Sequence, residues 1–194
     1  MENNRIIVVP YSDHWATVFN QLKAVFSDRL KDLFISIEHV GSTAVPGLSA
    51  KPIIDTDIII KDKSRFEEIV EILDKLGYTH QGDMGIPGRA AFKRRSELTP
   101  EDGSGRTWPQ HHLYVCLQDS VSLKNHLSFR DFLRANPRKA KEYGALKLQL
   151  AKEYPLDIDS YIEGKTKFIT AMLESTGFSQ EALSDITAQN KAPK

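Results

Sequence analysis

The chain has 194 residues, with 26 Lys and Arg against 26 Asp and Glu, so its formal net charge is zero. Proteins that bind long nucleic acid usually carry a basic excess, so this balance favours a small molecule as the ligand and no long nucleic acid is expected. A single cysteine, Cys116, excludes an internal disulfide, and the apolar runs are too short for a signal peptide or a membrane span, so we expect a cytoplasmic protein with no membrane partner.

The predicted elements begin with a short strand and a long helix. Residues 5–9 form a β-branched run that ends at Pro10 and predicts an edge strand. Apolar residues then recur at helical spacing and predict one amphipathic helix over residues 13–33. Two further apolar runs, residues 34–40 and 52–60, predict core strands.

The second core strand contains two acids, Asp55 and Asp57. Side chains alternate along a strand, so these carboxylates point the same way, about 7 Å apart. Two bare carboxylates on one face repel each other, and a divalent cation removes that cost. Oxygen ligands without an accompanying cysteine favour Mg²⁺ or Mn²⁺ over zinc, so Asp55 and Asp57 are the predicted metal ligands. A strand whose acids face solvent is the alternative.

A glycine turn separates the two core strands. Gly41 lets the backbone approach a ligand closely, and free amides at such a turn suit phosphate oxygens. Ser42 and Thr43 add hydroxyl donors, and Lys51 precedes the acidic strand. These four residues are therefore predicted to bind a nucleotide or phosphate, although a solvated charge explains Lys51 equally well.

These motifs resemble a known signature. Gly41-Ser42, twelve intervening residues and then Asp55-Thr56-Asp57 resembles the signature of the nucleotidyltransferase superfamily, of the DNA polymerase beta and kanamycin nucleotidyltransferase type. The longer string over residues 39–55 resembles the GrpB family within that superfamily. The resemblance covers roughly residues 10–173. It implies an α/β (α+β) fold in which a nucleotidyltransferase-like mixed sheet is flanked by helices.

The middle of the chain continues the α/β pattern. Ser64 and Glu67 have the spacing of a capping box and predict a helix that ends at Gly77. Strands are predicted over residues 78–80 and 89–95. Residues 96–109 form a long polar loop, of a length typical of segments that bind or close over something, and its Arg106 is a candidate phosphate contact.

The strand over residues 110–117 carries His112, Tyr114 and Cys116 on one face. In the superfamily that the chain resembles, the corresponding strand usually carries a third carboxylate, and this strand has none. His112 is the predicted catalytic substitute, as a metal ligand or a base, and a buried structural histidine is the alternative. Glu38 and Asp119 are the candidates for the missing acid.

The last third of the chain is predicted to be helical. Arg130 lies on a helix that begins near residue 120, and Lys165 falls among the apolar positions of the last strong helix. Both are predicted to contact an anionic group of the ligand, with a solvated arginine and a snorkelling lysine as the alternatives. The predicted organisation is a core over residues 1–118, a helical portion over 119–176 and a polar tail over 177–194 that frays or forms one short helix.

Two functions remain open at this point. The resemblance implies a metal-dependent nucleotidyltransferase that holds a nucleoside triphosphate or phosphorylated small molecule, with Asp55, Asp57 and His112 as catalytic residues. The alternative is a non-catalytic module that binds a nucleotide or cofactor, or that assists another enzyme as a protein partner. A weaker hypothesis groups His39, His80, His111 and His112 as a transition-metal site.

Overall fold

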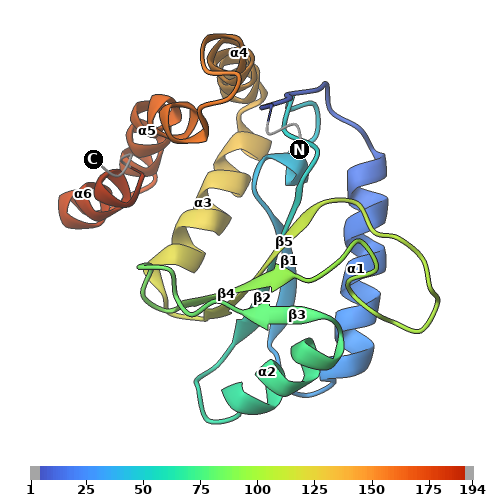
Figure 1. Ribbon diagram of the computed structural model, residues 1–194. Helices are drawn as coiled ribbons and strands as arrows, with labels where there is room; N and C mark the ends of the chain where they lie inside the picture. Colours follow the sequence, from blue (N-terminus) through green and yellow to red (C-terminus); the bar gives the residue numbers. More distant parts are fainter. Residues whose placement is uncertain (1–4, 191–194) are drawn as a thin grey trace. The chain divides into compact units, whose positions relative to one another are not determined.

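The computed structural model describes residues 5–190 and forms two compact units interleaved along the chain (Figure 1). The sheet unit comprises Asp13–Val40 and Ile53–Lys124, and the helical unit comprises, among the described residues, 5–12, Gly41–Pro52 and 125–190. The elements are α1 (His14–Leu30), β1 (Ser36–Val40), η1 (Ser42–Ala44), β2 (Ile54–Ile60), α2 (Phe66–Lys75), β3 (Tyr78–His80), β4 (Arg89–Arg94), β5 (His111–Leu117), α3 (Val121–Ala135), α4 (Pro137–Glu153), α5 (Ile158–Ser175) and α6 (Gln180–Gln189).

The sheet unit is built on a five-stranded mixed sheet in the order β1-β2-β5-β4-β3. Strands β2 and β5 run parallel, and the other neighbouring pairs are antiparallel. The two parallel strands β2 and β5 are buried along most of their length, which accounts for their nearly continuous apolar sequences. The predicted α/β class, with a mixed sheet flanked by helices and a helical C-terminal portion, is confirmed.

Helices α1 and α2 cover one face of this sheet. The Phe19 ring on α1 stacks on His39 of β1 at 4.6 Å between centroids, and Phe26 lies 6.0 Å from Tyr78 of β3. Phe66 on α2 meets His80 edge-on at 5.4 Å. Because side chains alternate along each strand, the residues between these positions point to the opposite face.

The start of α2 differs from the prediction. The expected capping box between Ser64 and Glu67 does not form, because the Ser64 N–H donates to Asp62 Oδ1 at 2.8 Å and the helix begins two residues later, after Arg65. The Asp62 side chain therefore holds this segment in a local turn, and this hydrogen bond competes with formation of the first helical turn.

The helical unit has its own apolar core. Phe129 of α3, Tyr143 of α4, and Met172 and Leu173 of α5 pack together with Leu183 of α6. Helix α4 begins at Pro137, a residue type favoured in the first turn of a helix, and α5 is capped by Asp157, whose carboxylate accepts from the Ser160 N–H at 3.0 Å. The predicted polar tail contains α6, which buries Leu183 and Ile186, while its last four residues lie outside the described part of the chain.

The predicted N-terminal strand is reduced to a single bridge between Val9 and Ala50. Ile6 instead donates its N–H to Pro155 O at 2.8 Å, so this segment is held by scattered hydrogen bonds of the helical unit. Residues 1–4 of the predicted core lie outside the described residues. The predicted boundaries at residues 118 and 176 stay predictions.

Candidate functional site

The sheet face opposite α1 and α2 is rich in acids, and we call it the acidic face. The pairing register places Val40, Asp55 and His112 in one row across β1, β2 and β5, and Glu38, Asp57 and Tyr114 in the next. Directly opposed residues on neighbouring strands have Cβ atoms about 5 Å apart. The acidic face is made up of Glu38, Asp55, Asp57, His112, Tyr114, Cys116 and Arg89.

Asp55 and His112 form a hydrogen-bonded pair. His112 Nδ1 lies 2.9 Å from Asp55 Oδ1, and the two side chains are 50% and 28% exposed. A carboxylate can only accept, so Nδ1 donates and Nε2 stays outside this hydrogen bond. The structure therefore brings the predicted catalytic histidine beside the predicted metal ligand.

Asp57 is fully buried, at 0% exposure. It lies opposite Glu38 on β1 and Tyr114 on β5, on the same face as Asp55. Burial, and after it the Asp57 carboxylate, raises the pKa of the Cys116 thiol. Of the two candidates for a third acid, Glu38 shares the row of Asp57, whereas Asp119 lies in the turn that follows β5.

Arg89 is a residue of this face that the sequence analysis did not select. It opens β4 opposite Cys116, and its guanidinium lies over the Tyr114 ring at 4.4 Å from the centroid. Burial and then the Asp55 charge raise the pKa of Tyr114 to about 12, while Arg89 opposes the shift. The alternation within β4 was readable from the sequence, but the strand that β4 would pair with was not.

The predicted phosphate-binding turn belongs to the helical unit. Gly41 has φ +69°, which glycine adopts readily and other residues do not, so the glycine is required here. After Gly41 only Ser42–Ala44 are helical, and Thr43 is buried at 1% exposure. Lys51 is half-buried and follows Ala50, whose backbone pairs with Val9.

Arg130 and Lys165 also belong to the helical unit. Arg130 is 9% exposed, and its Nε donates to Asp131 Oδ1 at 2.7 Å. Lys165 Nζ lies 4.4 Å from the centroid of the Tyr161 ring, a cation–π contact one turn away on α5. Both cations thus have local partners within the unit, and their predicted roles toward a ligand remain predictions.

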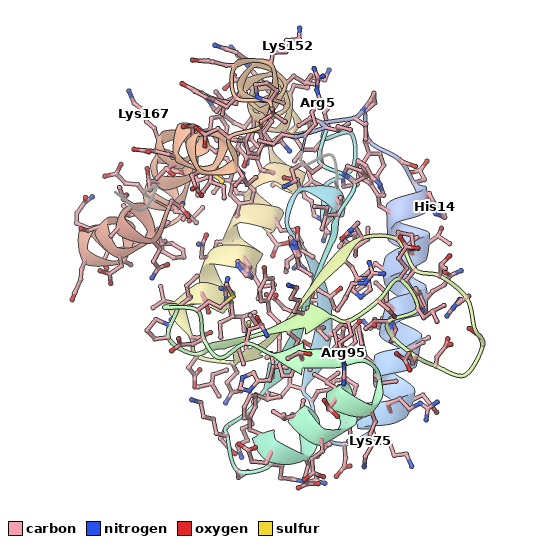
Figure 2. All side chains as sticks on the ribbon, viewed as in Figure 1. Arg5, His14, Lys75, Arg95, Lys152 and Lys167 are labelled. Atoms are coloured by element: carbon pink, nitrogen blue, oxygen red, sulfur yellow. The ribbon has the colours of Figure 1, made fainter. Side chains whose placement is uncertain are left out.

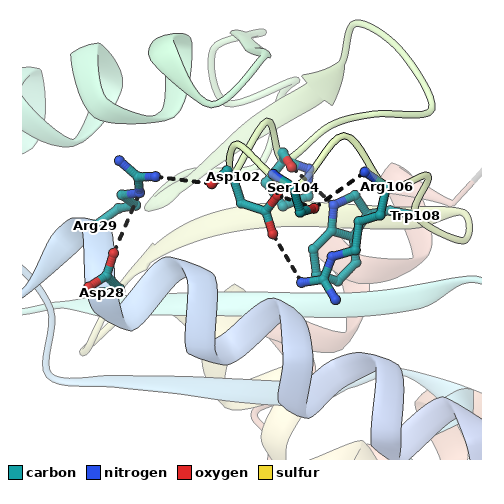
Figure 3. Close-up of polar contacts among 7 residues, drawn as sticks. Asp28, Arg29, Asp102, Ser104, Arg106 and Trp108 are labelled. Carbon is teal, nitrogen blue, oxygen red and sulfur yellow. Dashed lines mark hydrogen bonds and ion pairs between the residues drawn. The ribbon is translucent and has the colours of Figure 1, made fainter.

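The loop over residues 96–109 folds on itself (Figure 3). Asp102 Oδ2 lies 3.1 Å from Arg106 Nη2, its Oδ1 accepts from Ser104 Oγ at 2.6 Å, and its backbone carbonyl accepts from Arg29 Nη2 at 3.3 Å. The Ser104 hydroxyl is the main cause of a lowered pKa of the Asp102 carboxyl. The Arg106 guanidinium also stacks on Trp108 at 3.6 Å, so Arg106 is held within its own loop.

The four histidines of the transition-metal hypothesis occupy different surroundings. His39 stacks on Phe19, and His80 lies 5.1 Å from the Phe92 ring. His111 accepts at Nε2 from the Tyr78 hydroxyl at 2.6 Å and donates from Nδ1 to the Pro109 carbonyl at 2.9 Å. Within residues 5–190, no three side chains of His, Cys, Asp or Glu are grouped so that they could hold a metal ion by themselves.

A hollow of about 220 Å³ lies on the other face of the sheet. Its lining includes Ile60, Val115, Leu117, Phe66 and His80, and Arg89 at the start of β4 also contributes. Of these, Ile60, Val115 and Leu117 alternate with the residues of the acidic face, so this hollow is separate from Asp55 and Asp57.

Comparison with known proteins identifies the family. The family model described as GrpB protein matches residues 5–175, so the chain belongs to the GrpB family. It is 37% identical to the UPF0157 protein YqkA of Bacillus subtilis over 88% of this chain and 47% of that protein. It is 33% identical to the glutamate-rich protein GrpB of Alkalihalophilus pseudofirmus over 89% of this chain and 97% of that protein. The chain thus spans about half of the first relative and nearly all of the second.

The fold is also shared with a solved member of the family. The crystal structure of the conserved protein GrpB from Enterococcus faecalis superposes with a TM-score of 0.74 at 32% identity, over 92% of this chain and 98% of that one.

Among the described residues, no helix combines the length and apolar character needed to cross a membrane.

Proposed function

We propose that this GrpB-family protein binds a nucleoside triphosphate or another phosphorylated small molecule through Asp55 and Asp57, with Mg²⁺ or Mn²⁺ as cofactor. The observation that carries the proposal is the acidic face, where both carboxylates and Glu38 occupy adjacent positions on two strands. Burying one carboxylate beside two others is unfavourable unless positive charge compensates it. A cation and its phosphate ligand supply that compensation and give the site a function.

The two carboxylates supply only some of the ligands that such a cation needs, and this partial set is typical of sites that hold Mg²⁺ together with a phosphorylated ligand. Two carboxylates on one strand are fewer than the groups a protein uses to enclose a metal by itself, in agreement with the absence of any three-residue group within residues 5–190. Mg²⁺ is commonly held by one or two carboxylates, with water and substrate phosphates completing its six ligands. When bound, the cation would neutralise negative charge on the phosphates.

The reaction that the site supports best is nucleotidyl transfer to a hydroxyl of a small acceptor. The acceptor oxygen would attack the α-phosphorus, a new P–O bond would form, and pyrophosphate would leave. His112 would take the proton of the hydroxyl at Nε2, because its Nδ1 is engaged with Asp55. As part of this proposal, the predicted contacts of the nucleotide remain Gly41, Ser42, Thr43, Lys51, Arg130 and Lys165.

A non-catalytic module is the second candidate. It is favoured by the absence of a carboxylate among the β5 residues, His111–Leu117, and by the 26% identity to a dephospho-CoA kinase of Mycolicibacterium paratuberculosis over 81% of this chain and 42% of that protein. In this case the acidic face would bind a nucleotide or cofactor without turnover, beside a partner enzyme. A cytoplasmic location suits both candidates.

Calorimetry with ATP as the probe tests the binding proposal. ATP would be titrated with and without Mg²⁺ into the wild-type protein, Asp55→Asn and a control, Glu71→Gln, which removes an exposed acid from α2. We expect Mg²⁺-dependent binding that weakens at least tenfold in Asp55→Asn and is unchanged in Glu71→Gln. Equal binding by all three proteins would exclude the carboxylate pair.

Release of pyrophosphate then distinguishes the two candidates. Wild-type protein would be incubated with MgATP and a panel of small hydroxyl-bearing acceptors, beside His112→Gln. Turnover that depends on His112 while ATP affinity is retained supports the transferase. Binding with no pyrophosphate from any acceptor favours the module.

A further inference from the structure

Arg89 is a cation on the acidic face, and the family resemblance assigns it no role. Arg89 opens β4, and its pairing with Cys116 directs its side chain to the face of Asp55 and Asp57. The guanidinium lies over the Tyr114 ring, 4.4 Å from its centroid. Since Tyr114 is the neighbour of Asp57 across β5 and β2, this contact directs the cation toward the two acids.

One buried hydrogen-bond donor of Arg89 has no partner among the described residues. Its Nε is buried and has no acceptor in the part of the chain from 5 to 190. The other arginines of the sheet unit each donate to an acceptor: Arg29 to the Asp102 carbonyl, Arg65 to Glu68, Arg94 to the Pro109 carbonyl, Arg95 to Asp74 and Arg106 to Asp102. A guanidinium carries five N–H groups, and buried donors are nearly always satisfied. Arg94 also has a buried Nε without an acceptor in this part of the chain, but its Nη1 and Nη2 donate to the Pro109 and Trp108 carbonyls, so Arg89 is the arginine of this unit better suited to an external acceptor.

The charge of Arg89 also acts on the same groups as the two acids. It lowers the pKa of the Tyr114 hydroxyl and of the Cys116 thiol, against burial and against Asp57, which raise both. Arg89 and Asp57 therefore share one electrostatic environment.

We propose that Arg89 is a phosphate-binding residue that contacts ligand oxygens on the acidic face, on the side of β5 away from Asp55 and Asp57. This inference rests on the proposed function, because it assumes that a phosphorylated ligand is held there. The planar guanidinium matches phosphate oxygens in a two-pronged contact, and stacking on Tyr114 fixes its orientation before the ligand arrives. Arg89 would thus neutralise phosphate charge that a cation at Asp55 and Asp57 leaves uncompensated.

The competing role is that of an internal counter-ion for Asp57. A counter-ion and a phosphate ligand behave differently when the charge is removed. Loss of a counter-ion leaves the acids more negative and strengthens binding of a divalent cation alone. Loss of a phosphate contact weakens binding of the nucleotide and leaves binding of the cation alone almost unchanged.

Two calorimetric titrations of the full chain separate these roles. Arg89→Met, Arg89→Lys, Asp55→Asn and the wild-type protein would each be titrated with MgATP and, separately, with Mn²⁺ alone. Lys75→Met is the matched control, because Lys75 is exposed on α2, away from the acidic face (Figure 2). Thermal unfolding of each variant confirms that it is folded, and Arg89→Lys, which keeps the charge, decides the question if Arg89→Met does not fold.

We expect Arg89→Met to weaken MgATP about 10- to 100-fold, as for the loss of a hydrogen bond to a charged group, with Mn²⁺ affinity within about twofold of the wild type. Arg89→Lys should lie between them, because it loses the two-pronged geometry. Unchanged MgATP affinity in Arg89→Met, or an increase in Mn²⁺ affinity alone, overturns the inference. If Asp55→Asn loses MgATP and Arg89→Met does not, the proposed function stands and only this inference fails. If the wild type does not bind MgATP, both fail.

Discussion

We predict that the protein loses stability at acid pH because of His111, and the structure gives the size of this loss. His111 is 3% exposed, and its ring is hydrogen-bonded at both nitrogens in the neutral form, to the Tyr78 hydroxyl and the Pro109 carbonyl. Burial lowers the pKa of His111 from 6.5 to about 4, with a smaller contribution from the charge of Arg94. The protein should therefore lose stability when the unfolded chain, but not the folded one, binds this proton.

The sign and size follow from proton linkage. Above pH 6.5 the ring is neutral in both states, so the contribution of His111 to stability is fully present. Between pH 6.5 and 4 the unfolded state binds the proton first, so the free energy of unfolding falls as the pH falls. A shift of about 2.5 pKa units at about 1.4 kcal/mol per unit corresponds to a loss of about 3 kcal/mol across this window.

Urea unfolding at pH 7.5, 6, 5 and 4 tests this prediction on the wild type and His111→Gln. At pH 7.5 the variant should be less stable by about 1–3 kcal/mol, because buried hydrogen bonds are disturbed. By pH 4 this difference should have moved by about 3 kcal/mol in favour of the variant, so that it vanishes or reverses, since glutamine does not titrate. His14→Gln, an exposed histidine on α1, serves as the control. A difference between wild type and His111→Gln that is the same at every pH would refute the reasoning.

Two further predictions concern the sheet unit. Gly77→Ala should lower the free energy of unfolding by about 1–3 kcal/mol, because φ is +91° and a Cβ would lie 2.8 Å from Thr99 Oγ1. Gly82→Ala, with φ +71° and no atom within 4 Å of its Cβ, should lose less, and equal losses in thermal unfolding would argue against crowding. Arg106→Ala should cost about 1 kcal/mol or less, because its ion pair with Asp102 is exposed on the arginine side, and should leave MgATP binding unchanged. Weaker MgATP binding would instead restore Arg106 as a ligand contact.

The local errors of the sequence analysis share one cause: residue spacing does not show which hydrogen bonds compete for a segment or which segments pair. The capping box at Ser64 was a correct spacing that lost to another local hydrogen bond, from Ser64 to Asp62. The N-terminal strand had the right composition but found only one bridge, at Val9. The loop over residues 96–109 was located correctly, while its internal contacts around Asp102 depend on side-chain geometry that spacing does not encode.

The sequence by itself determined the features that depend on short-range periodicity. Asp55 and Asp57 share a face because a strand repeats every two residues, and Gly41 marks a backbone conformation that other residues avoid. Tertiary structure decided which residues stand beside them. The pairing of β2 with β5 and of β5 with β4 brings His112 to Asp55 and Arg89 over Tyr114. Strand pairing joins residues that are distant in the sequence, such as Asp55 with His112 and Arg89 with Cys116, and its register is set by packing of the whole sheet rather than by any local pattern.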